Sequence, residues 1–76
     1  MVLHSPGIKS IQFMNNTILF VHLDNDRTFL IPLNKFSQIQ NLSAEERNEF
    51  EIIDGKYLSF LSIDDIFSVE DLIGIQ

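Results

Sequence analysis

Two neighbouring segments of the chain, residues 17–23 and residues 27–33, are rich in apolar, β-branched and aromatic residues. Such short runs are typical of β-strands, in which successive side chains point to opposite faces. The Asp-Asn-Asp sequence at residues 24–26 favours a turn, since these side chains bond the local backbone and tolerate left-handed geometry. The two segments therefore predict a β-hairpin. Its core face is predicted to consist of Leu19, Val21, Leu23, Phe29, Ile31 and Leu33.

The opposite face of this hairpin carries Ile18, Phe20 and Leu30, and it is too apolar for a simple solvated face. Large exposed apolar patches usually mark sites of interaction. Two interpretations stay open: the chain's own helices cover these residues, or a partner does, including a second copy of the chain. We therefore treat the three residues as candidate partner-binding residues.

Shorter signals on both sides of the hairpin predict further elements. Residues 8–13 predict a strand that ends at an Asn-Asn turn, and residues 36–40 predict a short helical turn. Ser43 begins the clearest helix, which is expected to run to about Phe50. The Ser43 hydroxyl can accept a hydrogen bond from the Glu46 amide while the Glu46 carboxylate reaches back, so this helix has a capping box.

A second hairpin and a final helix follow in the acidic half of the chain. The Asp-Gly sequence at residues 54–55 is a strong turn signal between residues 51–53 and residues 56–61. Ser68 is a candidate N-cap for the last helix, and Gly74 can take the left-handed conformation that ends it.

These elements define the expected fold. Residues 1–7 form a flexible leader, and residues 8–76 form a single domain of the α+β class. We expect a small, mostly antiparallel sheet of about five strands with two or three short helices. A domain of this size buries only about 60% of the surface of its unfolded chain, so its core is marginal.

Charge is distributed unevenly along the sequence. The net charge is −6, with +1 in residues 1–44 and −7 in residues 45–76. Direct binding of nucleic acid by this chain alone is not expected, because it needs a basic footprint that neutralises phosphates. The acidic half suits a basic protein partner, or it merely keeps a small domain soluble. On the first interpretation, Glu49, Asp64 and Asp65 are candidate partner-binding carboxylates.

The sequence shows no targeting or membrane-spanning segment. Its first residues lack a basic region followed by a long apolar run, and no window approaches the roughly 18 apolar residues of a membrane span. There is no cysteine, which fits a reducing compartment. We expect a cytoplasmic protein that has no membrane partner.

The sequence carries little that resembles catalytic equipment. His22 lies at a strand end, where a surface position is the simpler interpretation. Asp64 and Asp65 would suit a hard metal ion, but the next two residues are apolar and no glycine supplies the sharp turn of a calcium loop. An enzyme would need a cleft at His22 or at this aspartate pair. We expect no catalytic, cofactor-binding or metal-binding residues, no cofactor and no enzymatic activity.

The order of these elements is more distinctive than any one of them. The segments concerned are residues 19–27 (Leu-x-Val-x-Leu-Asp-Asn-Asp-Arg), 31–36 (Ile-Pro-Leu-x-x-Phe), 42–47 (Leu-Ser-Ala-Glu-Glu-Arg), 50–52 (Phe-Glu-Ile) and 63–72 (Ile-Asp-Asp-Ile-Phe-Ser-Val-Glu-Asp-Leu). In their order and spacing the chain, from Ile8 to Ile75, resembles a short bacterial domain family, domain-of-unknown-function family 2442. It departs from the family at residues 60–61, which are Phe-Leu where the family often has Trp-Pro, and at residues 25–26, which are Asn-Asp where the family commonly has Asp-Gly.

The resemblance implies a compact α+β domain without known enzymatic activity. Such domains are often encoded beside a second small protein that looks like a toxin, from domain-of-unknown-function family 4160. The implied partner is therefore a small, basic protein toxin. No individual binding residue is carried over from the family, because the matched positions look structural.

Several functions follow as hypotheses. The first is a protein-interaction module, the antitoxin of a bacterial type II toxin–antitoxin pair, in which Phe20 fills a pocket of the toxin and a rim of carboxylates pairs with its basic side chains. The alternative is a nucleic-acid-associated transcriptional regulator acting alone or with its partner, which needs a basic patch built from Lys9, Arg27 and Lys35. A further hypothesis is a homodimer formed through Ile18 and Phe20.

Overall fold

The computed structural model describes residues 6–74, so the first five residues of the predicted leader and the last two residues of the predicted domain lie outside this range. The strands are β1 (Ile8–Met14), β2 (Ile18–Leu23), β3 (Thr28–Pro32), β4 (Phe50–Ile53), β5 (Tyr57–Phe60) and β6 (Ile66–Ser68). The helical segments are the 3₁₀ turn η1 (Leu33–Lys35) and the helices α1 (Ser37–Gln40), α2 (Ala44–Asn48) and α3 (Val69–Ile73).

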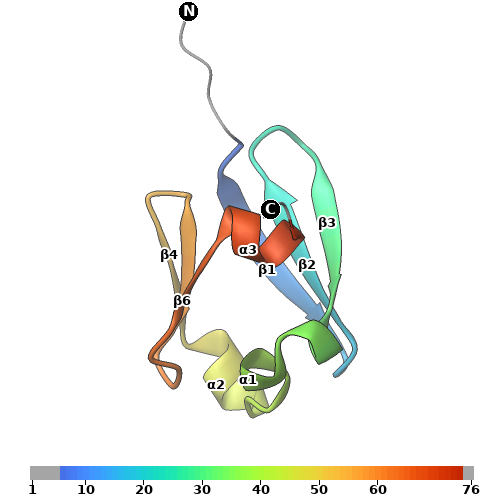
Figure 1. Cartoon of the computed structure of the whole chain (residues 1–76), viewed down its shortest axis with the longest axis vertical. Helices are drawn as coiled ribbons and strands as arrows, with labels where there is room; N and C mark the ends of the chain where they lie inside the picture. Colours follow the sequence, from blue (N-terminus) through green and yellow to red (C-terminus); the bar gives the residue numbers. More distant parts are fainter. Residues whose placement is uncertain (1–5, 75–76) are drawn as a thin grey trace, which may run out of the picture.

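The strands form two antiparallel sheets, which we call sheet A (β1–β2–β3) and sheet B (β4–β5–β6). The sheets lie on two sides of the molecule, α1 and α2 close one end, and α3 lies between the sheets (Figure 1). The α+β class and the antiparallel pairing predicted from the sequence are confirmed.

The described residues contain six strands in two sheets, where the sequence predicted about five strands in one. The sixth strand, β6, is only three residues long, and its last residue is also the N-cap of α3. Its strand pattern was therefore hidden by a helix-capping signal. The division into two sheets follows from the connection between β3 and β4, where η1, α1 and α2 intervene.

Sheet A is a pair of hairpins with short turns. Asn15 (φ 53°) and Asp26 (φ 67°) take the left-handed conformation in the two turns, which Asn and Asp tolerate better than most residues. Pro32 ends β3, the edge strand, where its missing N–H is tolerated. The core face predicted for the β2–β3 hairpin is confirmed, because the inward residues Leu19, Val21, Leu23, Ile31 and Leu33 are buried and Phe29 packs against them half-buried.

Capping boxes begin both helices whose N-caps, Ser43 and Ser68, were predicted from the sequence. The Ser43 hydroxyl accepts from the Glu46 N–H at 3.2 Å, and the Glu46 carboxylate accepts from the Ser43 N–H at 2.8 Å. Ser68 and Asp71 make the same reciprocal pair at the start of α3. Gly74, at φ 80°, ends α3 as expected, whereas α2 ends earlier than expected because Phe50 already belongs to β4.

The hydrogen bonds of the first capping box also perturb the titration of Glu46. The backbone N–H of Ser43 makes the largest contribution, followed by the hydroxyls of Ser62 and Ser43, and together they lower the pKa of the Glu46 carboxyl below its ordinary value.

Aromatic side chains join the two sheets in the core. The ring centroid of the buried Phe60 is 6.2 Å from that of Phe13 in β1 and 6.1 Å from that of Phe50 in β4. A second pair, Phe36 and Phe67, meets edge to face at 5.8 Å and connects the helical segment to β6. The buried hydrophobic residues form one cluster of Ile8, Leu19, Val21, Leu23, Ile31, Leu33, Ile39, Leu42, Leu58, Phe60, Phe67 and Leu72.

Arg47 is a buried charged residue whose contacts were not predicted from the sequence. Its side chain is 8% exposed, and its Nη1 and Nη2 atoms donate to the backbone carbonyls of Asn15 and Gln40, each at 2.9 Å. The guanidinium carbon lies 4.9 Å from the centre of the Phe13 ring, within the range of a cation–π contact. The guanidinium thus holds together α2, the end of α1 and the turn between β1 and β2.

A close backbone contact joins the start of sheet A to sheet B. The Ile8 N–H donates to the carbonyl of Gly55 in the β4–β5 turn at 2.6 Å, and the Asp24 N–H donates to the carbonyl of Gly7 at 2.9 Å. A Cβ on Gly7 would lie only 3.2 Å from both the Asp24 Oδ2 atom and the Gly55 carbonyl oxygen. A residue without a side chain therefore fits this junction best.

Candidate protein-binding surfaces

The outer side of sheet A, which we call face A, contains the apolar residues predicted as partner-binding. Antiparallel pairing places side chains in rows across the strands, and two of these rows are Met14–Ile18–Pro32 and Gln12–Phe20–Leu30. Directly paired residues share a face, so Ile18, Phe20 and Leu30 are brought together as the alternation predicted.

Face A is left open by the helices within residues 6–74. Leu30 is 60% exposed and Met14 is 46% exposed, while Ile18 and Phe20 are half-buried. The buried Leu72 of α3 belongs to the core cluster, which places this helix on the inner side of the sheets. The interpretation that the chain's own helices cover this face is therefore wrong for Leu30.

The outer side of sheet B, which we call face B, is apolar in its middle and acidic at its margins. Ser59 of β5 pairs with Glu51 of β4 on one side and with Ile66 of β6 on the other. The same alternation places Tyr57 on this face, and the hydrogen bond from the Leu61 N–H to the Glu49 carbonyl at 3.0 Å extends the register by one more pair. Face B thus consists of Glu49, Glu51, Ile53, Tyr57, Ser59, Leu61, Ile66 and Ser68.

Three apolar side chains of face B are well exposed. Leu61 is 76% exposed, Ile66 is 53% exposed and Tyr57 is 42% exposed. None of these three residues was predicted from the sequence as partner-binding. The signal that would have found them is the period of two in side-chain direction along a strand, because Leu58 and Phe60 take the core face and leave Tyr57 and Leu61 outside.

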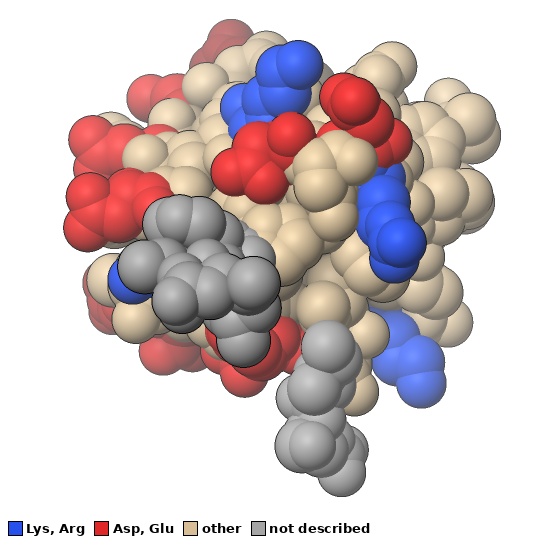
Figure 2. Space-filling model, turned by 90° about the horizontal axis from the view of Figure 1, so that it is seen from above, with Lys and Arg blue, Asp and Glu red and all other residues tan. Residues whose placement is uncertain are grey.

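The predicted carboxylates lie beside face B and away from face A. Glu49 directly precedes β4, and Asp64 and Asp65 are exposed in the loop that leads into β6. Figure 2 shows acidic side chains gathered on the left of the molecule, the side on which sheet B lies in Figure 1.

The six predicted partner-binding residues therefore fall into two groups on different sheets. One group is Ile18, Phe20 and Leu30 on face A, and the other is Glu49, Asp64 and Asp65 beside face B. The expected arrangement of Phe20 as an anchor inside a rim of these carboxylates is not formed. The period-two pattern placed Ile18, Phe20 and Leu30 on one face of their strands correctly, but it contains no information about where the three carboxylates lie relative to that face.

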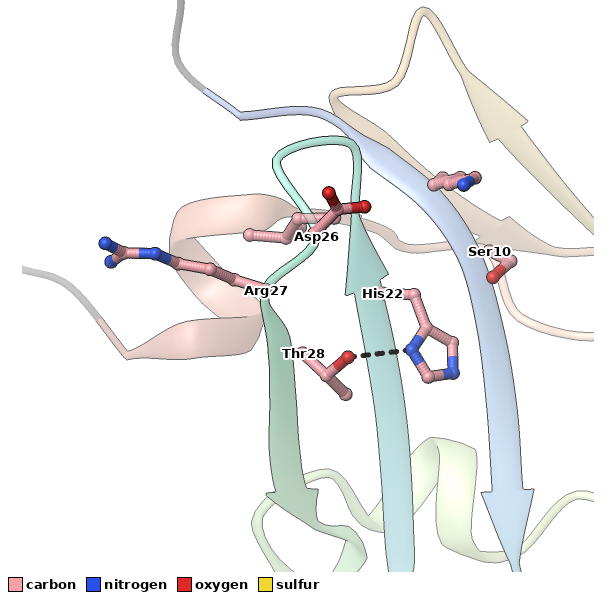
Figure 3. Close-up of a pocket in the computed structure, with 7 residues that line it drawn as sticks. Ser10, His22, Asp26, Arg27 and Thr28 are labelled. Carbon is pink, nitrogen blue, oxygen red and sulfur yellow. Dashed lines mark hydrogen bonds between the residues drawn. The ribbon is translucent and has the colours of Figure 1, made fainter.

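A shallow, open depression lies at the polar end of face A (Figure 3). His22 and Thr28 pair across β2 and β3, and the His22 Nδ1 atom shares a hydrogen bond of 2.9 Å with the Thr28 hydroxyl. Lys9, Asp26 and Arg27 also line the depression. A histidine beside a hydroxyl is half of a nucleophile–base arrangement, but catalysis by such a pair also needs a group that orients the ring.

The basic side chains from which a nucleic-acid-binding patch was predicted, Lys9, Arg27 and Lys35, do not gather on one surface. Lys9 and Arg27 line the depression together with the carboxylate of Asp26. Lys35 lies in η1, so it and Arg27 flank opposite ends of β3. Arg47 is buried and bonded to carbonyl groups. The basic patch that a nucleic-acid regulator would need is not formed by these residues.

Within residues 6–74, no helix is long and apolar enough to cross a membrane. Across the same residues, the His, Asp and Glu side chains nowhere form a group of three or more that could hold a metal ion.

The comparisons with known proteins agree with the resemblance seen in the sequence. A family model described as "Protein of unknown function (DUF2442)" matches residues 8–74, which is nearly the whole chain. Comparison with curated proteins and with solved structures gives no match. The match confirms the family and leaves the biochemical role to be argued from the surfaces.

Proposed function

Because the chain belongs to DUF2442, a family of proteins of unknown function whose model matches residues 8–74, we propose its role from its own surfaces: it is a protein-interaction module that acts by direct binding. We further propose that it is the antitoxin of a bacterial type II toxin–antitoxin pair. On this proposal the domain is not an enzyme, and its work is to occupy a surface of its partner.

The observation that carries the proposal is the exposure of large apolar side chains on the outer faces of both sheets. Leu30 on face A and Leu61 and Ile66 on face B are each more than half exposed. Fully burying a side chain of this kind contributes about 1.5–3 kcal/mol. A partner that covered one of these faces would gain a large part of that free energy at each residue.

The net charge supports a basic partner. The chain carries a charge of −6, so it attracts a small basic protein at long range and repels nucleic acid. An antitoxin that binds its toxin stoichiometrically needs only such a complementary surface, because blocking the working surface of the toxin is sufficient. The alternative role as a regulator lacks a supporting observation, since Arg27 and Lys35 flank opposite ends of β3.

A pull-down from the native host tests the proposal. The tagged chain is used as bait at low and at high salt, and a captured protein is then expressed alone and together with this chain. We expect a small basic protein that is lost at high salt, that arrests growth when it is expressed alone and that is tolerated when this chain is coexpressed. A captured protein that is harmless alone would contradict the antitoxin role.

The solution mass of the isolated chain provides the control. Light scattering separates a monomer with free sheet faces from a homodimer that occupies one of them. A stable homodimer with no second protein in the pull-down would replace the antitoxin proposal with self-association.

A further inference from the structure

Face B combines an apolar centre with a carboxylate margin on a single surface. We infer that face B, and not face A, is the surface on which the protein docks its partner, and that it fits a cationic protein surface whose basic side chains flank an apolar ridge. This inference rests on the proposed function and names the surface and the partner chemistry that the function requires.

The apolar centre is contiguous because of the strand register. Ile66 pairs directly with Ser59 in the central strand. Tyr57 and Leu61 lie two residues to either side of Ser59, so both are diagonal neighbours of Ile66. The small Ser59 side chain between them leaves these three exposed apolar groups to define the contact surface.

Carboxylates flank this centre on two sides. Glu51 of the edge strand β4 lies opposite Ser59, and Glu49, which directly precedes this strand, lies opposite Leu61. Asp64 and Asp65 lie in the loop that precedes Ile66, and all four carboxylates are exposed. Arg47 cannot neutralise them, because its guanidinium is turned into the core and donates to two backbone carbonyls.

Face A lacks this combination. None of the residues of β1, β2 and β3 is acidic, and the depression at one end of the face is lined by Lys9 and Arg27 together with one carboxylate, Asp26. A cationic partner that approached face A would therefore meet no carboxylate on the strands, and two positive charges beside a single negative one at the margin. Electrostatic complementarity favours face B for such a partner.

The partner is expected to dock on side chains rather than to extend the sheet as an added strand. The edge strand β6 has only three residues, and the N–H of Ser68 already donates to the Asp71 carboxylate in the capping box of α3, at 3.3 Å. A short edge whose last amide is occupied offers little backbone for pairing.

Peptide titration of the isotopically labelled full chain tests this inference by NMR. The probe is a synthetic amphipathic helix of leucines and lysines, with the leucines on one stripe and the lysines on both sides of it. A peptide in which glutamate replaces every lysine is the charge control. We expect the lysine peptide, but not the glutamate peptide, to shift the amide signals of β5, β6 and the 61–65 loop.

Matched variants separate the two faces. Leu61→Ser removes an exposed leucine from face B, and Leu30→Ser removes an exposed leucine from face A. Leu61→Ser is expected to raise the dissociation constant of the lysine peptide by about tenfold, whereas Leu30→Ser should leave this constant unchanged within about twofold. The double variant Glu49→Gln/Asp65→Asn is expected to bind the lysine peptide more weakly than the unchanged chain at about 50 mM salt. The difference in affinity between the two proteins should shrink at about 300 mM salt, because salt screens the exposed carboxylates.

The inference is overturned by shifts centred on face A, by the absence of localised shifts, or by Leu30→Ser weakening binding as much as Leu61→Ser does. The peptide titration needs no protein from the host. A failure there removes face B as the docking surface, whereas the pull-down and growth assay judge the antitoxin proposal separately.

Discussion

The Nη1 atom of Arg47 donates a hydrogen bond of 2.9 Å to the backbone carbonyl of Asn15, a residue 32 positions earlier in the chain. Asn15 is the left-handed residue of the β1–β2 turn, and Arg47 lies in the last turn of α2. The guanidinium therefore connects a turn of sheet A to the helix that leads into sheet B. Buried charges are expensive to place in a core, and this one is compensated by two carbonyls and an aromatic ring.

The first prediction concerns this contact. Arg47→Met keeps much of the apolar volume of the side chain but leaves the carbonyls of Asn15 and Gln40 without their charged donor. Hydrogen bonds to charged groups contribute about 1.5–3 kcal/mol, so we expect a loss of about 3 kcal/mol in the free energy of unfolding. Urea denaturation followed by circular dichroism measures it. Arg27→Met, at an exposed arginine, is the control and should change stability by less than about 0.5 kcal/mol.

A pair of leucine substitutions tests which side of sheet A is the core. Leu19→Ala removes a fully buried side chain, and Leu30→Ala removes one that is 60% exposed. Buried leucine-to-alanine changes cost about 2–5 kcal/mol, whereas exposed ones stay within about 0.5 kcal/mol. The unfolding midpoint in urea should therefore fall strongly for Leu19→Ala and hardly change for Leu30→Ala. Equal losses would show that face A is covered in solution.

Local chemistry made much of the fold predictable from the sequence. Ser43 and Ser68 begin helices through contacts that reach only three residues, and Gly74 ends α3 through its own backbone conformation. The alternation of residues 17–23 placed Leu19 inward and Phe20 outward for the same reason. Each of these signals is read and satisfied within one element, so the sequence alone contains it.

The features that the sequence did not reveal all join distant segments. Arg47 contacts carbonyls at residues 15 and 40, and no pattern around residue 47 indicates them. The separation of Phe20 from the carboxylates of Glu49 and Asp65 depends on which strands share a sheet, and helices between β3 and β4 decide that. Face B follows from the same pairing, so its composition became visible only with the register of β4, β5 and β6.

A glycine substitution tests the junction between the sheets. Gly7→Ala would place a methyl group 3.2 Å from the carbonyl oxygen of Gly55, which is already held at 2.6 Å by the Ile8 N–H. Because that carbonyl cannot withdraw without losing its hydrogen bond, we expect a loss of about 1 kcal/mol and faster hydrogen exchange at the Ile8 amide.

Gly74→Ala provides the comparison for the junction. A Cβ at Gly74 meets nothing within 4 Å, but the residue has a φ of 80°, so its cost of about 1 kcal/mol arises from backbone strain alone. In Gly74→Ala, the hydrogen exchange rate of the Ile8 amide should reflect only the global loss of stability. A Gly7→Ala variant without local acceleration at Ile8 would contradict the proposed crowding.

The last prediction concerns the pH dependence of stability through Glu46. Hydrogen bonds from the backbone N–H of Ser43 and from the hydroxyls of Ser62 and Ser43 lower the pKa of this carboxyl in the folded protein. A group whose pKa is lower in the folded state than in the unfolded state binds fewer protons when the protein is folded. Its contribution to stability is therefore present above the unfolded pKa, about 4.3 for glutamate, and is lost as the pH falls through the folded pKa.

Glu46→Gln keeps the capping-box contact, because a glutamine at this position also bonds the N-cap amide, but it does not titrate. We therefore expect the wild-type chain to be more stable than Glu46→Gln at pH 6 and the two unfolding midpoints to converge as the pH is lowered below about 4. Unfolding curves recorded for both proteins across this range measure the difference, and midpoints that stay parallel at every pH would show that the Glu46 carboxylate contributes no more as an ion than a neutral amide does.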